Sequence, residues 1–386
     1  MNILVQLSHP AHFHLYKNAI KNLQADGHFV FVLIKTKDML EDLLRNAGIA
    51  YHNILPVAHR SSKIGILWDM LVRDWRMMRF AIRHHIDMLT GSTPEVGHVA
   101  WLLRRKAVTT TEDDSAVVPA FAKVATPFLQ CIITPSTCNN GRMEPKSVKY
   151  PGYHELAYLH PNHFTPDPKI VKAYSIDTSK PYFILRFASL NAHHDSGIKG
   201  INTEVAQHLI DILSPHGRIY ITSERPLEPQ FEQYRIHINP LDMHHVMAFA
   251  SLYIGDSQTM AAEAGVLGVP FVRFNDFVGR IGYLRELEDV YKLGYGIHAT
   301  PLAADSPICR NDGSAQPSGV EELYKRVEQL VAMPAEERRT TFQARREKML
   351  SEKIDCAKFL TWFIENYPKS VEETKKADKE FWDRFR

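Results

Sequence analysis

Short apolar runs alternate with amphipathic segments from the start of the chain. Residues 3–7 and 29–34 are apolar enough for buried strands, and residues 17–25 have the three-to-four-residue periodicity of a helix. A second helix over residues 39–46 and a third strand over residues 49–54 complete a β-α-β-α-β opening. This order predicts a parallel sheet with helices on both faces, and such sheets bind ligands beyond the carboxyl ends of their strands.

A second alternation of the same kind begins at residue 182, with strands expected over residues 182–187, 217–222, 252–254 and 270–274. Residues 162–181 are rich in proline and polar residues, which is typical of a linker. We therefore expect an α/β protein with two Rossmann-like, doubly wound domains facing across a cleft. The predicted parts are an N-terminal domain over 1–161, a linker over 162–181, a second domain over 182–345, a continuous helix over 336–365, and C-terminal helices over 346–386 that pack back on the first domain.

The longest helix of the first domain, over residues 64–86, carries apolar side chains at three- or four-residue steps. These are Ile64, Leu67, Trp68, Leu71, Trp75, Met78 and Ile82, and the arginines beside them are Arg73, Arg76, Arg79 and Arg83. We expect a core-facing helix with a solvated basic face, because the tryptophans fall on the apolar stripe. The alternative is peripheral contact with the inner face of an anionic membrane, where the protein would reach a lipid-linked acceptor.

Composition excludes several classes of protein. The length of 386 residues suggests two domains of ordinary size, and 46 basic against 44 acidic residues leave a net charge of +2, which argues against a nucleic-acid binder that works by bulk charge. The 4 cysteines form no C-x-x-C pair, so neither a zinc ribbon nor a disulfide framework is indicated. We see no secretory signal and no apolar run as long as a membrane span, and we expect a cytoplasmic protein.

The most specific chemistry lies in residues 250–272, which read ASLYIGDSQTMAAEAGVLGVPFV. A strand and a tight turn lead into a helix that begins near Gln258 or Thr259, so the unbonded N–H groups of its first turn would face the strand ends. Together with the hydroxyls of Ser257 and Thr259, this turn suits a diphosphate. Glu263, one turn further on, could accept hydrogen bonds from both hydroxyls of a ribose. The alternative is an N-capped helix with a solvated Glu263.

Gly-Asp-Ser-Gln-Thr, followed by Glu263 and the Gly-Val-Pro of residues 268–270, resembles the donor-site helix of GT-B glycosyltransferases and of the related non-hydrolysing UDP-N-acetylglucosamine 2-epimerases. In those families small polar residues at the helix start bind the diphosphate, and the glutamate binds the ribose. The resemblance therefore implies diphosphate contacts for Ser257, Gln258 and Thr259, and a ribose contact for Glu263. The families often have two small residues where this chain has Gln258.

Four further stretches carry a narrower likeness. They are HPAHFHLYKNAIKNLQADGH at 9–28, TEDDSA at 111–116, YPGYHELAYLHP at 150–161 and HDSG at 194–197. Together they resemble a GT-B-like family known as domain of unknown function 354, over most of the chain. The resemblance implies a GT-B-like fold and a role in surface-polysaccharide or glycan assembly.

His9, His12 and His14 lie in HPAHFH, which is expected to form a loop at the end of the first strand. In GT-B enzymes this loop faces the acceptor and the donor sugar. The pKa of histidine lies near neutrality, so one ring could act as general base on an acceptor hydroxyl; we expect His12 first and His9 second, with His14 as a sugar contact. One alternative is a metal site, but no carboxylate partner is obvious, and we expect no metal. The other is helix capping and packing.

Three carboxylates, Glu112, Asp113 and Asp114, follow the predicted strand over residues 107–111. We expect them at the carboxyl end of that strand, where Glu112 or Asp113 could act as the base or orient a histidine. One alternative is a divalent-metal motif, which GT-B enzymes do not generally need. Another is an acidic N-cap cluster for the next helix.

Other candidates follow the strands of the second domain. Arg186 could meet a phosphate through its guanidinium fork, Ser223 is expected beside the nucleotide, and Met243 precedes a helix at which the base would bind. The remaining candidates are Gly255 in the nucleotide-binding turn and His154, His194 and Asp195 as sugar contacts. For the segment around His154, packing at the end of the first domain is the alternative.

These residues predict a metal-independent GT-B-like glycosyltransferase, without a cofactor, that moves a sugar from a nucleotide-sugar donor, UDP-linked by preference, to a glycan or lipid-linked acceptor. One rival is a UDP-N-acetylglucosamine 2-epimerase-like enzyme, in which the acidic cluster would abstract and return a proton at the sugar ring. Another rival is a non-catalytic sugar-nucleotide-binding protein. A Rossmann dehydrogenase is disfavoured, because no G-x-G-x-x-G follows the first strand.

Overall fold

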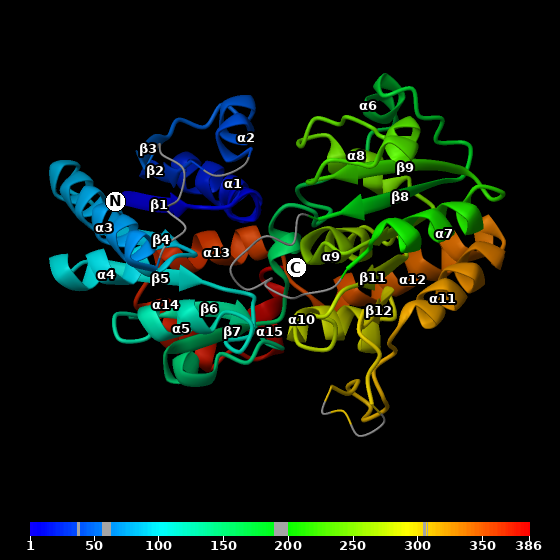
Figure 1. Ribbon diagram of the computed structural model, residues 1–386. Coiled ribbons are helices and arrows are strands. Elements are labelled where there is room, and N and C mark those ends of the chain that lie inside the picture. Colours follow the sequence, from blue (N-terminus) through cyan, green and yellow to red (C-terminus); the bar gives the residue numbers. More distant parts are fainter. Residues whose placement is uncertain (37–38, 56–62, 189–199, 304–305, 307) are drawn as a thin grey trace. The chain divides into compact units, whose positions relative to one another are not determined.

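The chain forms two compact units. The structure, a computed structural model, describes residues 1–36, 39–55, 63–188, 200–303, 306 and 308–386 (Figure 1). The first unit comprises Met1–His163 and Lys353–Arg386, and the second comprises Phe164–Glu352. The second unit therefore begins within the segment predicted as a linker, and it extends past the predicted boundary at residue 345.

A parallel sheet organises the first unit. Among the described residues it has seven strands, in the order β3-β2-β1-β4-β5-β6-β7. The strands are β1 (Asn2–Leu7), β2 (Phe29–Lys35), β3 (His52–Leu55), β4 (Met88–Gly91), β5 (Lys106–Thr110), β6 (Ile132–Pro135) and β7 (Ser147–Tyr150). Leu4, Leu33 and Leu89 from three of them pack against Met77. The sequence patterns do not predict strands β6 and β7, because runs of four residues show no clear periodicity.

Helices cover this sheet on both faces, as expected for a parallel sheet. They are α1 (Pro10–Ala25), α2 (Leu40–Asn46), α3 (Lys63–Arg83), α4 (Pro94–Leu103), α5 (Pro119–Ala125), α13 (Cys356–Glu365), α14 (Lys369–Lys375), α15 (Lys379–Asp383) and the 3₁₀ turns η1 (Gly141–Lys146) and η2 (His154–Ala157). No helix among the described residues combines the length and the apolar composition that crossing a membrane requires.

Helix α1 begins seven residues before the predicted start, so HPAHFH does not form a loop. Pro10 occupies the first helical position, where its missing N–H costs nothing, and the Nδ1 atom of His9 caps the helix by accepting a hydrogen bond from Ala11 N at 3.2 Å. His12 and His14 therefore lie within the first turns of α1. A histidine cap has no strong sequence signature, which is why the boundary was placed too late.

Helix α3 is oriented differently from the prediction. Its buried stripe carries Asp69, Arg73 and Met77, and Arg73 Nε donates to Glu95 of α4 at 2.6 Å. Trp68 and Trp75 are exposed. The expectation that the tryptophans lie on the core-facing stripe is wrong, because this helix packs on the sheet through Met77 and Ala81 and on α4 through the buried ion pair. The exposed basic face is present, at Arg76, Arg79 and Arg83.

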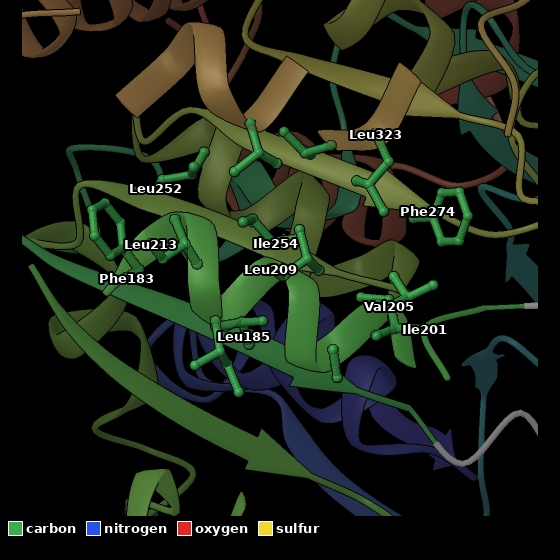
Figure 2. Packing of buried hydrophobic residues seen from close by; sticks show 14 of the residues in the cluster. Phe183, Leu185, Ile201, Val205, Leu209, Leu213, Leu252, Ile254, Phe274 and Leu323 are labelled. Carbon is green, nitrogen blue, oxygen red and sulfur yellow. The ribbon is translucent and has the colours of Figure 1, made fainter. Parts of the chain in front are cut away.

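A second parallel sheet, of five strands within the described part, organises the second unit in the order β12-β11-β10-β8-β9. The strands are β8 (Tyr182–Phe187), β9 (Arg218–Ser223), β10 (Leu252–Gly255), β11 (Phe271–Phe274) and β12 (Gly294–Ile297). Its helical segments are α6 (Pro168–Ala173), α7 (Thr203–Leu213), η3 (Pro229–Tyr234), α8 (Met243–Ala248), α9 (Gln258–Val266), α10 (Gly282–Arg285), η4 (Glu286–Val290), α11 (Val320–Ala332) and α12 (Ala335–Glu352). Figure 2 shows the core, where Leu185 and Ile254 of the sheet meet Leu209 of α7 and Leu323 of α11.

Two predicted boundaries need correction. The segment predicted as a linker contains α6, and Tyr174 just after it donates a hydrogen bond to Asp242 at 2.7 Å, so this segment packs on the second unit. The helix predicted over residues 336–365 is interrupted, because Asp355 leaves the helical conformation and caps α13 through Lys358 N at 3.1 Å. The α/β class, with two units built on parallel sheets, is confirmed.

Candidate functional site

The strand order of the second unit reverses direction beside β8. Strand β8 lies between β9, which follows it in sequence, and β10, which the chain reaches only by crossing over. Ligands of open parallel sheets bind at such a reversal, beyond the carboxyl ends of the strands. Here Asp256, after β10, accepts a hydrogen bond from Ala188 N, after β8, at 2.6 Å, and Asn275 Nδ2 donates to Asp256 O at 2.8 Å. These bonds hold the loops after β8, β10 and β11 together.

Position 255 requires glycine, because β10 approaches β8 so closely there that a side chain would not fit. A Cβ at this position would lie 2.6 Å from the hydroxyl of Tyr253 and 2.9 Å from the carbonyl oxygen of Arg186. Neither the buried tyrosine nor the neighbouring backbone can move away cheaply. The glycine thus shapes the turn, and its predicted contact with a nucleotide stays a prediction.

Helix α9 starts at this turn with a polar cap. Ser257 is the N-cap residue, and its hydroxyl accepts a hydrogen bond from Met260 N at 3.5 Å. Ser257, Gln258 and Thr259 are all half-buried, whereas the following helical residues, from Ala261 onward, are buried. The helix therefore presents only its first turn, with unbonded N–H groups and the positive end of its dipole, at the carboxyl edge of the sheet.

Glu263 lies deeper, and it is held by a neighbouring helix. Its side chain is only 6% exposed, and its Oε1 atom lies 2.9 Å from Nε2 of His244 on α8. The alternative of a solvated Glu263 is therefore wrong. Met243, the predicted base contact, is the first residue of the same helix and is half-buried. Helix α8 thus carries both Met243 and His244, and His244 orients Glu263, the predicted contact to the ribose.

Arg186 lies at the end of β8 and forms an ion pair with Glu224, which follows β9. A bound phosphate would compete with this carboxylate for the guanidinium group. Ser223, the last residue of β9, accepts a hydrogen bond through its hydroxyl from Arg225 N at 3.2 Å and donates one to Arg225 O at 2.7 Å. In this conformation Ser223 stabilises the turn after its strand.

Asp256 is the most strongly perturbed carboxylate beside α9. Burial raises its pKa from the ordinary 3.8 to about 6, and the hydrogen bond from Ala188 N acts in the opposite direction. The side chain is almost fully buried. A buried carboxylate is costly when it is charged, and a second anion nearby would add to that cost. The charge of the turn between β10 and α9 therefore depends on pH through the ionisation of Asp256.

In the first unit, the order of the sheet reverses between β1 and β4, and His9 and His12 follow β1. Their ring centroids are 6.0 Å apart. The Nδ1 atom of His12 accepts a hydrogen bond from Ser8 N at 3.3 Å, so the neutral ring carries its proton on Nε2. Proton abstraction by His12 would therefore use Nδ1 and compete with Ser8. His14 is buried, and its ring centroid lies 5.0 Å from that of Tyr158, as the packing alternative predicts.

Glu112, beyond β5, contacts the 3₁₀ turn η2. Its Oε2 atom accepts a hydrogen bond from His154 N at 3.2 Å and lies 3.3 Å from His154 Nδ1. Burial lowers the pKa of His154 to about 3, so the ring is neutral at pH 7 and its contact with Glu112 is not an ion pair.

Asp113 and Asp114 complete the acidic cluster. Asp113 is half-buried, and Asp114 accepts a hydrogen bond from Asn139 N at 2.8 Å. The cluster does not cap the next helix, whose N-cap residue is Val118, so that alternative is wrong.

Two predicted sugar contacts, His194 and Asp195, lie outside the described residues. Within the described parts of the chain, no group of three or more His, Cys, Asp or Glu side chains is arranged to hold a metal ion.

Four hydroxyl groups at the strand ends of the first unit form a connected hydrogen-bond network that the sequence patterns did not predict. The Tyr16 hydroxyl lies 2.9 Å from Thr90 Oγ1 and 3.2 Å from Thr110 Oγ1, and Ser92 Oγ lies 2.6 Å from Thr110 Oγ1. The short polar run after β4 was a visible signal for Ser92. Nothing local marked Tyr16, which comes from the middle of α1.

The fold resembles solved structures over nearly the whole chain. MnaA of S. aureus, in a structure with UDP, matches with a TM-score of 0.64 at 11% identity, over 97% of this chain and 98% of that chain. The UDP-GlcNAc 2-epimerase of Neisseria meningitidis, bound to UDP-GlcNAc, matches with a TM-score of 0.61 at 12% identity, over 98% and 100%. The spinosyn forosaminyltransferase SpnP matches with a TM-score of 0.60 at 15% identity, over 97% and 100%.

At these identities the likeness shows the fold alone, which is the GT-B-like fold expected from the donor-site motif. No model of a known protein family matches the chain. No curated protein matches it in sequence. Membership of the narrower family, domain of unknown function 354, therefore stays a prediction.

Proposed function

We propose that this protein is a sugar-nucleotide enzyme of the glycosyltransferase type. It would transfer a sugar from a UDP-linked donor to a glycan or lipid-linked acceptor in surface-polysaccharide assembly, in the cytoplasm. The observation that carries the proposal is the first turn of α9, with a buried Glu263 held by His244 behind it. Solved structures of the same fold with UDP or UDP-GlcNAc bound support the choice of nucleotide.

The leaving diphosphate would meet the start of α9. Its charge would be balanced by the N–H groups and hydroxyls of Ser257 and Thr259, together with the Gln258 amide. Arg186 would add a guanidinium group after exchanging Glu224 for a phosphate oxygen. Glu263 would accept hydrogen bonds from the ribose hydroxyls, because an ionised carboxylate accepts several at once. With this set, catalysis would need neither a metal nor a cofactor.

The acceptor proton would pass to a group at the strand ends of the first unit. His12 remains our first choice, and its Nδ1 atom would exchange the bond from Ser8 for the acceptor hydroxyl. His9, Glu112 and Asp113 are the other candidates. His9 and Glu112 each already accept a backbone hydrogen bond, from Ala11 N and His154 N. An acid-base role for one of these groups should appear as a pH dependence of the transfer rate that the corresponding variant loses.

A screen of melting temperatures with UDP-, GDP-, CMP- and dTDP-sugars tests the donor. We expect UDP-sugars to give the largest rise, because ligands that bind only the folded protein stabilise it. The Glu263→Gln variant should lose that rise, whereas Glu328→Gln, an exposed residue of α11, should keep it. No shift with any sugar-nucleotide would overturn the proposal.

An epimerase is the second candidate, favoured by the match to an enzyme that carries this activity in its name. The two reactions differ at the C2 atom of the sugar, because a 2-epimerase removes and returns a proton there. We expect no deuterium at C2 when the protein is incubated with UDP-GlcNAc in deuterated water without an acceptor. Deuterium at C2 would exclude the transferase as first choice. Binding without turnover across a broad donor and acceptor panel would favour a non-catalytic sugar-nucleotide-binding protein.

A further inference from the structure

One face of α3 exposes apolar side chains in a continuous row. Its members are Leu67, Trp68, Leu71, Trp75 and Ile82, each 51–57% exposed, and we call them the α3 face. The 3.6-residue repeat brings these positions to one side of the helix, opposite the buried stripe. A surface helix of a globular protein shows the reverse arrangement, with its apolar residues buried and its polar residues in water.

The charges next to the α3 face are positive. Arg76, Arg79 and Arg83 are exposed along one border of it, and the guanidinium carbon of Arg79 lies 4.8 Å from the centre of the Trp75 ring. Of the two acidic residues of α3, Asp69 is buried, and Asp74 is half-buried and contacts His98 of α4 at 3.0 Å. Among the described side chains of α3, the exposed charged groups are therefore these three arginines, whereas Arg73 and both carboxylates are buried or half-buried.

The neighbouring helix α4 also exposes apolar side chains. Helices α3 and α4 lie side by side in the first unit (Figure 1), joined by the pairs Arg73–Glu95 and Asp74–His98. At the end of α4, Trp101 and Leu102 are more than half exposed. The buried pairs fix α3 to the unit, so the α3 face is a rigid surface.

We propose that the α3 face docks on the surface of an anionic lipid bilayer. Tryptophan and leucine side chains would enter the boundary between head groups and acyl chains, with the helix axis in the membrane plane. The flanking arginines would meet lipid phosphates, which attract positive side chains near an anionic surface. The inference goes beyond the proposed function, because the docking uses none of the site residues of either unit and would hold for a transferase or an epimerase alike.

Charge disfavours the binding of a second copy of the chain to the α3 face. Two copies that met through the α3 face with their helices antiparallel would bring their arginine borders together, and like charges repel at close range. An anionic bilayer has the opposite sign over the same area. The charge pattern therefore favours lipid over self-association.

Co-sedimentation of the full chain with vesicles tests the proposal. We expect binding to vesicles of equal parts phosphatidylcholine and phosphatidylglycerol, weaker binding to phosphatidylcholine alone, and a loss of the difference at high salt. The double variant Trp68→Ser, Trp75→Ser should reduce the partition coefficient roughly tenfold or more, because it removes two large apolar side chains from the interface. Its melting temperature should be unchanged, since both side chains are exposed.

Phe29→Ser is the matched control, because Phe29 is 71% exposed in the same unit but lies on β2 and is not a member of the α3 face. It should bind both vesicles as the unchanged protein does. The double variant Arg79→Gln, Arg83→Gln should abolish the preference for the anionic vesicles and keep the weak binding to phosphatidylcholine.

Three outcomes would overturn the proposal. The first is no sedimentation with the mixed vesicles, and the second is equal sedimentation of the tryptophan variant. The third is a dimer in analytical ultracentrifugation that the tryptophan variant converts to a monomer, since the α3 face would then be an interface between copies. A failed vesicle test would leave the nucleotide screen unaffected, so the two proposals can fail separately.

Discussion

His244 Nε2 lies 2.9 Å from Glu263 Oε1, and both side chains are buried. The bond joins α8 to α9 and fixes the orientation of a carboxylate one to two turns behind the helix start. A carboxylate held in this way is already oriented for a ligand, which avoids the entropic cost of ordering it on binding. The pair therefore places His244 as a positioning residue for the predicted ribose contact.

Glu263→Gln should weaken UDP binding without unfolding the protein. The amide keeps the shape of the side chain and an oxygen that can accept from His244, but it loses the charge. A hydrogen bond to a charged group is worth about 1.5–3 kcal/mol, so we expect roughly a tenfold to hundredfold rise in Kd. Calorimetry with UDP measures it, with Glu328→Gln as control. An unchanged Kd would remove Glu263 from the site.

His244→Phe should act on both stability and binding. Phenylalanine fills the space of the ring but leaves the buried carboxylate without this donor, so the free energy of unfolding should fall by about 1–3 kcal/mol in urea denaturation. UDP affinity should fall as well, because the carboxylate is no longer oriented. His244→Gln, which restores a donor, should recover part of both. Loss of stability with full UDP affinity would contradict the positioning role.

Asp256 should make stability depend on pH. Its pKa is about 6 in the folded protein against an ordinary 3.8, so between these values the folded protein holds a proton that the unfolded chain has released. The contribution to stability is complete below about pH 4 and is lost as pH rises through about 6, by roughly 3 kcal/mol in total. Asp256→Asn should remove this slope in denaturation curves measured between these pH values. The same slope in the variant would assign it to other groups.

The same residue should affect binding of the donor. Deprotonation of Asp256 adds a negative charge beside the first turn of α9, so affinity for a UDP-sugar should fall as pH rises through about 6. A UDP-sugar suits this calorimetric test better than UDP, because its diphosphate lacks the terminal phosphate proton that titrates in the same range. Asp256→Asn should flatten the profile. A profile that is flat in the unchanged protein would separate Asp256 from the diphosphate.

Glu224→Gln should strengthen UDP binding, because it removes the carboxylate that competes for Arg186. The Glu224 side chain is 46% exposed, so solvent screens the pair, and we expect only a two- to fivefold fall in Kd, on the scale of about 0.2–1 kcal/mol for such pairs. Arg186→Gln should raise Kd. Glu232→Gln breaks an exposed ion pair with Arg235 in the same unit and serves as control. If neither change at the Arg186 pair alters Kd, Arg186 does not contact the diphosphate.

Local sequence patterns determined much of the fold. Buried parallel strands such as β1 and β8 are apolar over most of their length, and the helices between them repeat every three to four residues, so the α/β class follows from the sequence. The start of α9 was also visible, because a small polar residue before a helix is a local N-cap signal. These features depend on neighbours within a few residues.

Contacts between distant residues decided the rest. The partner of Glu263 is 19 positions away in sequence, and that of Arg186 is 38 positions away. In α3, periodicity revealed two faces, but the packing of Met77 on the sheet and the ion pair between Arg73 and Glu95 decided which one is buried. The same holds for residues 353–386, which belong to the first unit although they follow the second. Sequence determined the kind of elements and several of the groups they carry; tertiary structure decided which face is buried and which groups meet, because burial and pairing depend on partners that no local window contains.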